Sequence, residues 1–263
     1  MLSWSINLFR IRGIQLALHG SFLLLLGYAA WEGWQEEGRS GLVWSVATLV
    51  AFFACVVLHE LGHSFMALRY GIGVRRILLM PIGGMAEFDS IPRQPSREFL
   101  MTLAGPSVNF ALAAALWFVV RTLGDEVPFY SLEGLVYQLF VANLVMGCFN
   151  LLPAFPMDGG RILRALIATR LPYLRATFWA ARVGKVIAFL GILVALAAPE
   201  LHVANHRLWL LAVLFGFISI AGESEYRATV RREIEDAHWR ETLARIYSRA
   251  PQEEPPLLPH VNP

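Results

Sequence analysis

Charged residues are scarce in this chain, and their scarcity excludes most classes of soluble protein. Only 16% of the 263 residues are charged, whereas 56% are hydrophobic, and the mean hydropathy is +0.52. An average soluble domain carries about 25% charged residues. A disordered protein, a coiled coil and an ordinary soluble enzyme are therefore excluded, and an integral membrane protein is the remaining class. The formal net charge of +2 is too small to indicate binding to nucleic acid.

Cysteine and aspartate are scarce as well. The two cysteines, Cys55 and Cys148, lie within apolar runs, so a disulfide framework is excluded and the redox compartment stays open. The aspartates are Asp89, Asp125, Asp158 and Asp236. Few residues are therefore available as an aspartate ligand of a metal site.

Long apolar runs, by contrast, are abundant. A helix that crosses a bilayer needs about 17 to 25 apolar residues. Runs of this kind predict six transmembrane helices, at residues 13–31, 42–68, 99–122, 135–152, 176–198 and 207–222. The first run follows Arg10 and Arg12 and also fits a secretory signal with a cleavage site at residues 27–29. Its length favours an uncleaved helix.

The charges of the connecting segments alternate in sign. Segments 1–12, 69–98 and 153–175 are rich in arginine, whereas segments 32–41 and 123–134 are acidic. Basic residues in short loops mark the cytoplasmic side of a membrane. The pattern predicts a multi-pass protein of a prokaryotic cytoplasmic membrane, with both termini in the cytoplasm.

The predicted domain organisation places residues 1–222 in one transmembrane domain. Residues 223–250 are charged with spaced apolar side chains, which predicts a cytoplasmic amphipathic helix. This helix either lies at the membrane surface or against a partner, or stands as a solvated stalk. Residues 251–263 are rich in proline and are predicted to form a disordered tail.

A histidine pair and a glutamate interrupt the second apolar run. His59 and His63 are four residues apart, so both imidazoles lie on one face of a helix. Glu60 is adjacent to His59 and can reach a water molecule held between the imidazoles. Ionisable groups inside a membrane helix are unfavourable and mark functional sites. The pattern predicts a catalytic zinc site, and the alternative is a buried polar cluster that ties helices together.

A catalytic zinc has three protein ligands and one open position. Asp158 follows the fourth apolar run on the predicted cytoplasmic side. His59 lies about 25 Å along a span that starts outside, at 1.5 Å per residue, so the two side chains have compatible depths. Asp89, on a glycine-containing loop, is the weaker candidate for the third ligand. Asp125 is predicted on the opposite side of the membrane, and Asp236 is predicted in the C-terminal helix, so neither is a candidate for the third ligand.

Two motifs together resemble the site-2 protease family of intramembrane zinc metalloproteases. One is His59-Glu60-x-x-His63, and the other is NLLPAFPMDGGR at residues 150–161, which matches the family pattern Asn-x-x-Pro-x-x-x-x-Asp-Gly at every position. Residues 105–109 and 4–25 resemble two further family elements. The resemblance covers about residues 4–222 and indicates a compact member without the PDZ or CBS domains that many relatives carry.

The resemblance implies a metal centre and a general base. His59, His63 and Asp158 hold one zinc ion per chain. Glu60 takes a proton from water and later passes it to the leaving amine. Zinc polarises the scissile carbonyl and lowers the pKa of water.

The resemblance also implies substrate contacts from Asn150, Pro153, Gly83 and Gly84. Asn150 contacts the substrate backbone or the developing oxyanion, and the alternative is an amide that caps the fourth span. Residues 77–88 are too short and interrupted for a span, so they are predicted to be re-entrant or strand-like. The resemblance implies a membrane-embedded sheet edge there, which pairs with an unwound substrate strand.

Three other polar or sulfur-bearing residues are predicted to be structural. Asn109 and His19 are expected to hydrogen-bond neighbouring helices, and Cys55 is expected to pack against its surroundings. The predicted fold is therefore an all-α polytopic membrane protein. It has six transmembrane helices and a small membrane-embedded strand-like element after the second helix.

The predicted function is an intramembrane zinc endopeptidase that performs regulated proteolysis of transmembrane segments near the cytoplasmic face. Its predicted partners are transmembrane substrates and the lipid bilayer, with a second copy or a regulatory membrane protein left open. The alternative is a non-proteolytic relative that binds a metal or holds a substrate. Glu60 favours the enzyme, because binding alone needs no general base. A metal transporter is disfavoured, since the span interiors outside the motifs contain almost no acidic residues.

Overall fold

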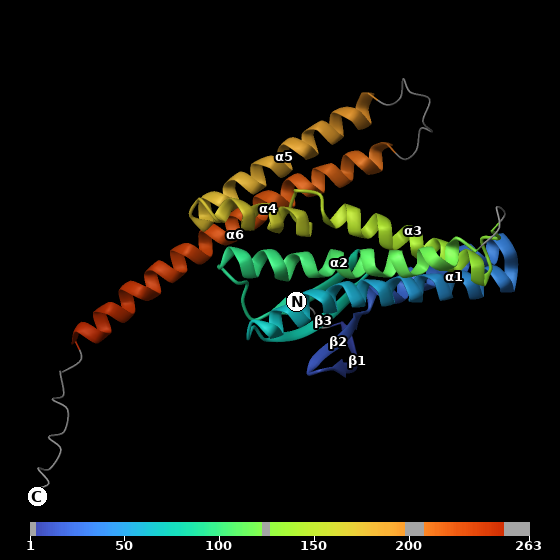
Figure 1. The fold of residues 1–263 in the computed structure, drawn as a ribbon, viewed down its shortest axis with the longest axis horizontal. Helices are drawn as coiled ribbons and strands as arrows, with labels where there is room; N and C mark the ends of the chain where they lie inside the picture. Colours follow the sequence, from blue (N-terminus) through green and yellow to red (C-terminus); the bar gives the residue numbers. More distant parts are fainter. Residues whose placement is uncertain (1–3, 123–126, 198–207, 250–263) are drawn as a thin grey trace, which may run out of the picture.

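The computed structural model describes residues 4–122, 127–197 and 208–249. Helices dominate, and a small sheet lies beside them (Figure 1). The strands are β1 Ser5–Ile11, β2 Ile14–His19, β3 Val74–Met80 and β4 Gly83–Phe88. The helices are α1 Ser21–Arg69, α2 Pro95–Val120, α3 Leu132–Asn150, α4 Asp158–Ala168, α5 Tyr173–Ala197 and α6 Leu208–Arg249.

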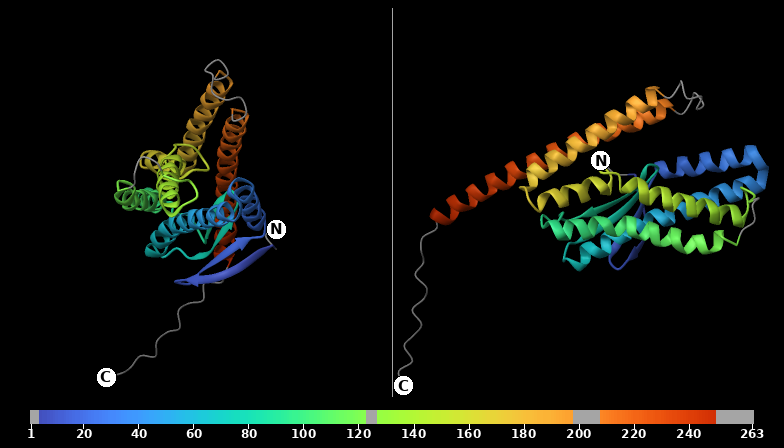
Figure 2. Two further views of the ribbon diagram at one scale, coloured as in Figure 1. Left: turned by 90° about the vertical axis from the view of Figure 1, so that its right-hand side faces the viewer. Right: turned by 45° about the horizontal axis from the view of Figure 1, so that its top comes forward.

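Helix α1 is a hairpin of two antiparallel arms rather than one straight rod. The backbone leaves helical geometry at Glu37 and Gly38. The rings of Phe22 and Phe53 meet edge-to-face at 4.6 Å, whereas a straight helix would separate these residues by about 46 Å. The two arms run back beside each other in Figure 2. They occupy most of the first two predicted runs.

The prediction of an all-α fold is wrong at the N-terminus. Residues 14–19, assigned to the first apolar run, form strand β2, and the preceding residues form β1. Arg12 and Gly13 have φ values of 48° and 88°, as a two-residue type I′ hairpin turn requires. Hydropathy could not separate this strand from the helix that follows, because both are apolar.

The four strands form one sheet in the order β1-β2-β3-β4. Strands β2 and β3 are parallel, with Leu16 opposite Ile77, and the other two pairs are antiparallel. The strand-like element predicted within residues 77–88 is confirmed as the β3–β4 hairpin. Among the described strands, β4 is one edge of the sheet, so one row of its backbone groups has no neighbouring strand there.

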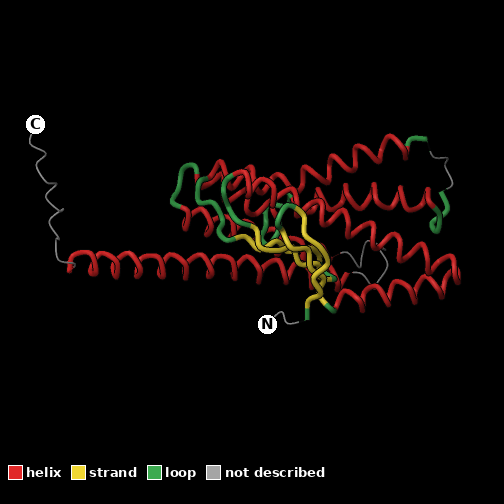
Figure 3. Tube along the Cα trace, turned by 90° about the horizontal axis from the view of Figure 1, so that it is seen from below, coloured by secondary structure: helices red, strands yellow, loops and turns green. Residues whose placement is uncertain are grey.

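The sheet packs on the second arm of α1, and Figure 3 shows the strands gathered against the helices. Buried apolar side chains of the strands and the arm form one cluster there. It includes Ile14, Leu16, Phe53, Val57, Leu61, Ile77 and Leu79. This packing fixes the β3–β4 hairpin against the helix that carries His59 and His63.

Four helices among the described residues are long and apolar enough to cross a bilayer, namely α1, α2, α3 and the Tyr173–Val194 part of α5. The chain is therefore an integral membrane protein. The predicted count of six transmembrane helices is not confirmed. Helix α1 is counted once despite its two arms, and residues 198–207, where the last two predicted runs meet, lie outside the described residues.

The C-terminal charged segment is the second half of one long helix. Helix α6 continues without interruption from Leu208 to Arg249 and projects beyond the other helices in Figure 1. The division into a transmembrane domain, a cytoplasmic helix and a tail stays a prediction. The predicted disordered tail at residues 251–263 lies outside the described residues, as does Asp125.

Candidate metal centre

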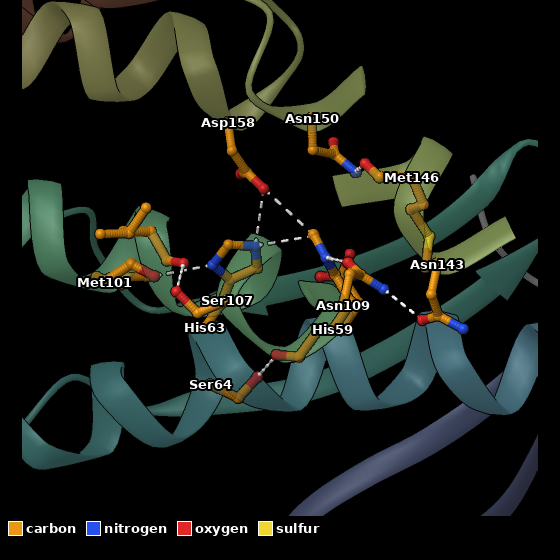
Figure 4. A network of polar contacts seen from close by, with 12 residues as sticks. His59, His63, Ser64, Met101, Ser107, Asn109, Asn143, Met146, Asn150 and Asp158 are labelled. Atoms are coloured by element: carbon orange, nitrogen blue, oxygen red, sulfur yellow. Dashed lines mark hydrogen bonds and ion pairs between the residues drawn. The ribbon is translucent and has the colours of Figure 1, made fainter. Parts of the chain in front are cut away.

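The two histidines lie on the buried face of the second arm of α1. His59 and His63 are 5% and 7% exposed, and their Nε2 atoms are 3.1 Å apart. The four-residue spacing places them one turn apart on the same face, as the sequence predicted. Both imidazoles point towards the start of α4 in Figure 4.

Asp158 completes the cluster from the first residue of α4. Its Oδ2 atom lies 3.3 Å from Nε2 of His59 and 3.1 Å from Nε2 of His63. The ionised form of a carboxyl group is the form that binds a metal.

Asp89, the weaker candidate for the third ligand, lies elsewhere. Its Oδ1 atom accepts a hydrogen bond from Nε of Arg75 at 2.7 Å. Among the described residues, only His59, His63 and Asp158 form a group that could hold a metal ion. The structure thus favours the choice of Asp158 over Asp89.

The spacing of the three donor atoms fits zinc. Tetrahedral zinc with bonds of about 2.0–2.1 Å separates neighbouring ligand atoms by about 3.3 Å. The three separations here are 3.1, 3.1 and 3.3 Å. Two imidazole nitrogens and one carboxylate oxygen also match the donor types that zinc prefers.

The second nitrogen of His63 fixes the protonation of its ring. Nδ1 lies 2.8 Å from the backbone carbonyl oxygen of Met101 on α2. A carbonyl oxygen can only accept, so Nδ1 carries the proton and donates it. Nε2 is then left with a free lone pair that faces the cluster.

The second nitrogen of His59 is fixed by a chain of amides. Nδ2 of Asn143 donates to the carbonyl oxygen of Leu139 at 2.8 Å, and Oδ1 of Asn143 accepts from Nδ2 of Asn109 at 2.9 Å. The Oδ1 atom of Asn109 therefore faces Nδ1 of His59, at 2.5 Å. His59 must donate from Nδ1, so its Nε2 lone pair also faces the cluster (Figure 4).

The hydrogen bonds at the Nδ1 atoms of His59 and His63 explain why the cluster favours a bound cation. Two imidazole lone pairs and one carboxylate oxygen converge within 3.3 Å. Three acceptors at this distance repel one another unless a positive charge lies between them. The hydrogen-bonded surroundings of the cluster therefore hold a geometry that a metal ion stabilises.

Glu60 lies between the histidine pair and the β3–β4 hairpin. Its backbone carbonyl accepts a hydrogen bond from the Ser64 hydroxyl at 2.7 Å. A Cβ atom placed on Gly84 would lie 2.7 Å from Cγ of Glu60. The side chain of Glu60 therefore touches strand β4 at Gly84, and Gly83 is the preceding residue, the first of that strand.

Asn150 adopts a local hydrogen bond. Its Nδ2 atom donates to the carbonyl oxygen of Met146 at 3.0 Å, so the amide helps to satisfy the last turn of α3. This contact is the capping alternative, and it leaves Oδ1 free to accept. Pro153 lies between α3 and α4 in the segment that leads to Asp158.

The roles of several residues were missed by sequence reasoning. Asn109 was predicted to bond a neighbouring helix, which it does through Asn143, but its bond to His59 was not foreseen. Asn143 and the Met101 carbonyl were missed altogether. A buried amide in an apolar helix was the one available signal, and it does not identify its partner. The prediction that His19 bonds a neighbouring helix is wrong, because His19 ends strand β2 and its Nδ1 atom contacts the hydroxyl of Ser21, two residues further on. Cys55 is buried.

Gly105 of α2 allows the close approach of that helix to the histidines. A Cβ atom on Gly105 would lie 2.2 Å from Nε2 of His63 and 2.8 Å from Nε2 of His59. We expect Gly105→Ala to lower zinc affinity by roughly 10–100-fold, the range seen when the groups around metal ligands are disturbed. Titration against a chromophoric chelator measures the change.

The matched control for Gly105→Ala is Gly27→Ala in the first arm of α1. A Cβ atom on Gly27 would meet nothing within 4 Å, so its zinc affinity should equal that of the wild type. Equal zinc affinity in both variants would show that the methyl group is accommodated and that the approach of α2 is not limiting.

Comparison with known proteins identifies relatives that cover most of the chain. The model of Peptidase family M50 matches residues 47–131 and 122–191. The chain is 38% identical over 226 residues to zinc metalloprotease MJ0392 of Methanocaldococcus jannaschii, covering 86% of this chain and 62% of that protein. It is 30% identical over 240 residues to the Mycobacterium tuberculosis protein Rip3, covering 87% of this chain and 60% of Rip3.

The fold has a solved counterpart. The structure of the site-2 protease from Methanocaldococcus jannaschii matches with a TM-score of 0.58 and 36% identity, over 85% of this chain and 95% of the other. The chain spans about three fifths of the length of the two curated relatives named above. With the family pattern, the shared fold and the histidine–aspartate cluster all present, the chain belongs to peptidase family M50, the site-2 family of zinc metalloproteases.

Proposed function

We propose that this chain is an intramembrane zinc endopeptidase that cuts transmembrane segments of other membrane proteins. The single observation that carries the proposal is the convergence of three zinc-type donor atoms from α1 and α4 within 3.3 Å, with Glu60 next to His59 on α1. A site that only binds a metal needs no adjacent general base. No described contact favours the non-proteolytic alternative.

Each residue of the site has a role in the proposed hydrolysis. His59, His63 and Asp158 hold zinc, which when bound supplies Lewis acidity to the scissile carbonyl. Glu60 accepts a proton from the attacking water at its carboxylate. It then delivers that proton to the leaving amine nitrogen as the C–N bond breaks.

Strand β4 is the proposed docking edge for the substrate. It pairs with β3 on one side only, and Gly84 touches the side chain of Glu60. An extended peptide that adds to this edge gains backbone hydrogen bonds and passes next to the general base. Gly83 and Gly84 leave room beside the peptide, and Asn150 and Pro153 are the proposed contacts from the segment that leads to α4.

The cut is proposed to lie in the cytoplasmic third of the substrate's membrane segment. The support is the arginine-rich character of segments 69–98 and 153–175, which flank the site in sequence. Water reaches the site by a shorter route from that surface than across the whole apolar core. The same pattern supports two cytoplasmic termini in a prokaryotic membrane.

Residues that weaken a substrate helix should accelerate its cleavage, because a helix hides its carbonyl groups in internal hydrogen bonds and β4 accepts an extended strand. We expect replacement of glycine or proline near the cut by leucine to slow cleavage by about fivefold or more, since these residues disfavour helix by about 1–3 kcal/mol. Gel assays of single-span substrates with purified enzyme measure the rates.

Mass spectrometry of the products from the same assay locates the cut. Leucine replacements distant from the cut serve as the matched control and should not alter the rate. Equal rates for all variants would argue against strand-like presentation. Cuts in the outer third of the substrate segment would overturn the proposed topology, and an absence of any zinc-dependent cleavage would support the non-proteolytic alternative.

A further inference from the structure

A buried ionic cluster joins three helices close to the metal centre. Arg164 of α4 and Glu98 of α2 are each 1% exposed. Nε and Nη2 of Arg164 donate to Oε1 of Glu98 at 2.8 and 2.6 Å, and Nη1 donates to Oε1 of Glu225 on α6 at 2.9 Å. A charge buried this completely is tolerated only while its partners stay in place. The cluster therefore fixes α2, α4 and α6 relative to one another.

Arg164 also holds the segment that leads to Asp158. Its guanidinium carbon lies 5.2 Å from the ring centroid of Phe155 and 5.0 Å from that of Tyr173. Phe155 is 1% exposed and precedes Asp158 by three residues. A Cβ atom on Gly160 would lie 2.6 Å from the backbone nitrogen of Phe155, so this segment packs tightly on the first turn of α4.

The other end of the cluster is tied to the histidines. Glu98 precedes Met101 on α2 by about one turn, and the Met101 carbonyl accepts the hydrogen bond from His63. One ion pair thus joins the helix that supplies Asp158 to the helix that orients His63. A displacement of α4 along α2 would move the Asp158 oxygen away from the two imidazole nitrogens, which now lie 3.1 and 3.3 Å from it.

Helix α6 is connected to the same region of α2 by a second ionic link. Arg93, just before α2, pairs with Glu233 and Asp236 of α6 at 3.1 and 2.6 Å. Both acidic residues belong to the C-terminal half of α6. The position of α6 is therefore coupled to the first turns of α2 at two points.

We propose that Arg164 is a positioning residue for the metal centre. It holds Asp158 at bonding distance from zinc by clamping α4 and the preceding segment to α2. Because Arg164 also pairs with Glu225, a displacement of α6 would alter the position of the Arg164 guanidinium. The inference rests on the proposed zinc site, because a positioned Asp158 matters only if it is a ligand.

The test measures zinc affinity directly in the full-length chain, purified in detergent, by competition with a chromophoric chelator. We expect Arg164→Met to lower zinc affinity by roughly 10–100-fold. Arg164→Lys keeps the charge but loses the planar fork, so it should restore part of the affinity. Glu225→Gln should weaken zinc binding by a few-fold, since Glu225 is the more exposed partner.

Glu223→Gln is the matched control, two residues from Glu225 on the same helix. Glu223 pairs with Lys185 and Arg227 and does not touch Arg164. Its zinc affinity should equal that of the wild type. Thermal unfolding, followed with and without chelator, separates positioning from general stability, because positioning lowers the zinc-dependent part of the stability.

The outcomes are distinct. If Arg164→Met aggregates, the test relies on Arg164→Lys and Glu225→Gln instead. Zinc affinities of both variants equal to that of Glu223→Gln would overturn the proposal. Lower thermal stability with unaltered zinc affinity would also overturn it, since Arg164 would then be only structural. A wild-type chain that binds no zinc would instead overturn the zinc site on which the proposal rests.

Discussion

Glu60→Gln is expected to lower the rate of peptide-bond cleavage by about 10²–10⁴-fold, the usual contribution of a general base, while zinc stays bound. Glutamine has nearly the same shape as glutamate but cannot accept the proton of the attacking water. Glu60 touches β4 through its side-chain stem, and the amide keeps that stem. Fold and metal binding should therefore be unchanged.

Cleavage rates and zinc content of the same preparation test this expectation. Glu235→Gln, an exposed glutamate of α6, makes the same chemical change far from the histidines in sequence and should retain the wild-type rate. Near-wild-type cleavage by Glu60→Gln would identify another group as the base. Loss of zinc along with activity would mean that Glu60 supports the metal rather than the proton transfer.

The double variant His59→Ala and Asp158→Ala is expected to lose its single zinc ion completely. It removes two of the three donor atoms that lie within 3.3 Å of one another, and one imidazole is too few to hold catalytic zinc. Activity should disappear with the metal and should not return when zinc is added. Metal analysis of the purified chain, at matched protein concentration, gives the number of zinc ions per chain.

Asp89→Ala is the matched control for the aspartate. Asp89 pairs with Arg75 on the surface, so its removal should leave the zinc content unchanged. Undiminished zinc in the His59 and Asp158 double variant would falsify the assignment of the metal centre. A zinc content that falls in Asp89→Ala as well would indicate a ligand set different from the one in the structure.

The local part of the site was readable from sequence. The positions of His59 and His63 on one helix face follow from the four-residue spacing, which any regular helix converts into a shared face. The hairpin at residues 74–88 was also partly readable, because its glycines and proline interrupt the apolar pattern. These features depend on neighbours in the chain, so short-range patterns were sufficient.

The third ligand, Asp158, could be predicted from sequence only by combining several observations. Asp158 was chosen because aspartate is scarce, because its predicted depth matches that of His59, and because the family pattern surrounds it. None of these observations gives a distance. The 3.1 and 3.3 Å separations arise from the packing of α4 against α2 and of α2 against α1.

The N-terminal sheet was misread because its partner is distant in sequence. Residues 14–19 are apolar and run directly into an apolar helix, so hydropathy joins the two. Their extended conformation is stabilised by backbone hydrogen bonds to β3, with Leu16 opposite Ile77. A strand needs such a partner, whereas a helix satisfies its hydrogen bonds within its own segment.

Composition and motifs within single segments were enough to assign the membrane class and the family, and to predict the ligands of the proposed centre. The groups that orient those ligands became apparent from the packing of the helices. The bond from Asn109 to His59 and the Arg164 cluster join residues 50 and 66 positions apart. Such contacts exist only because helix packing brings distant segments together, where burial favours the pairing of polar groups.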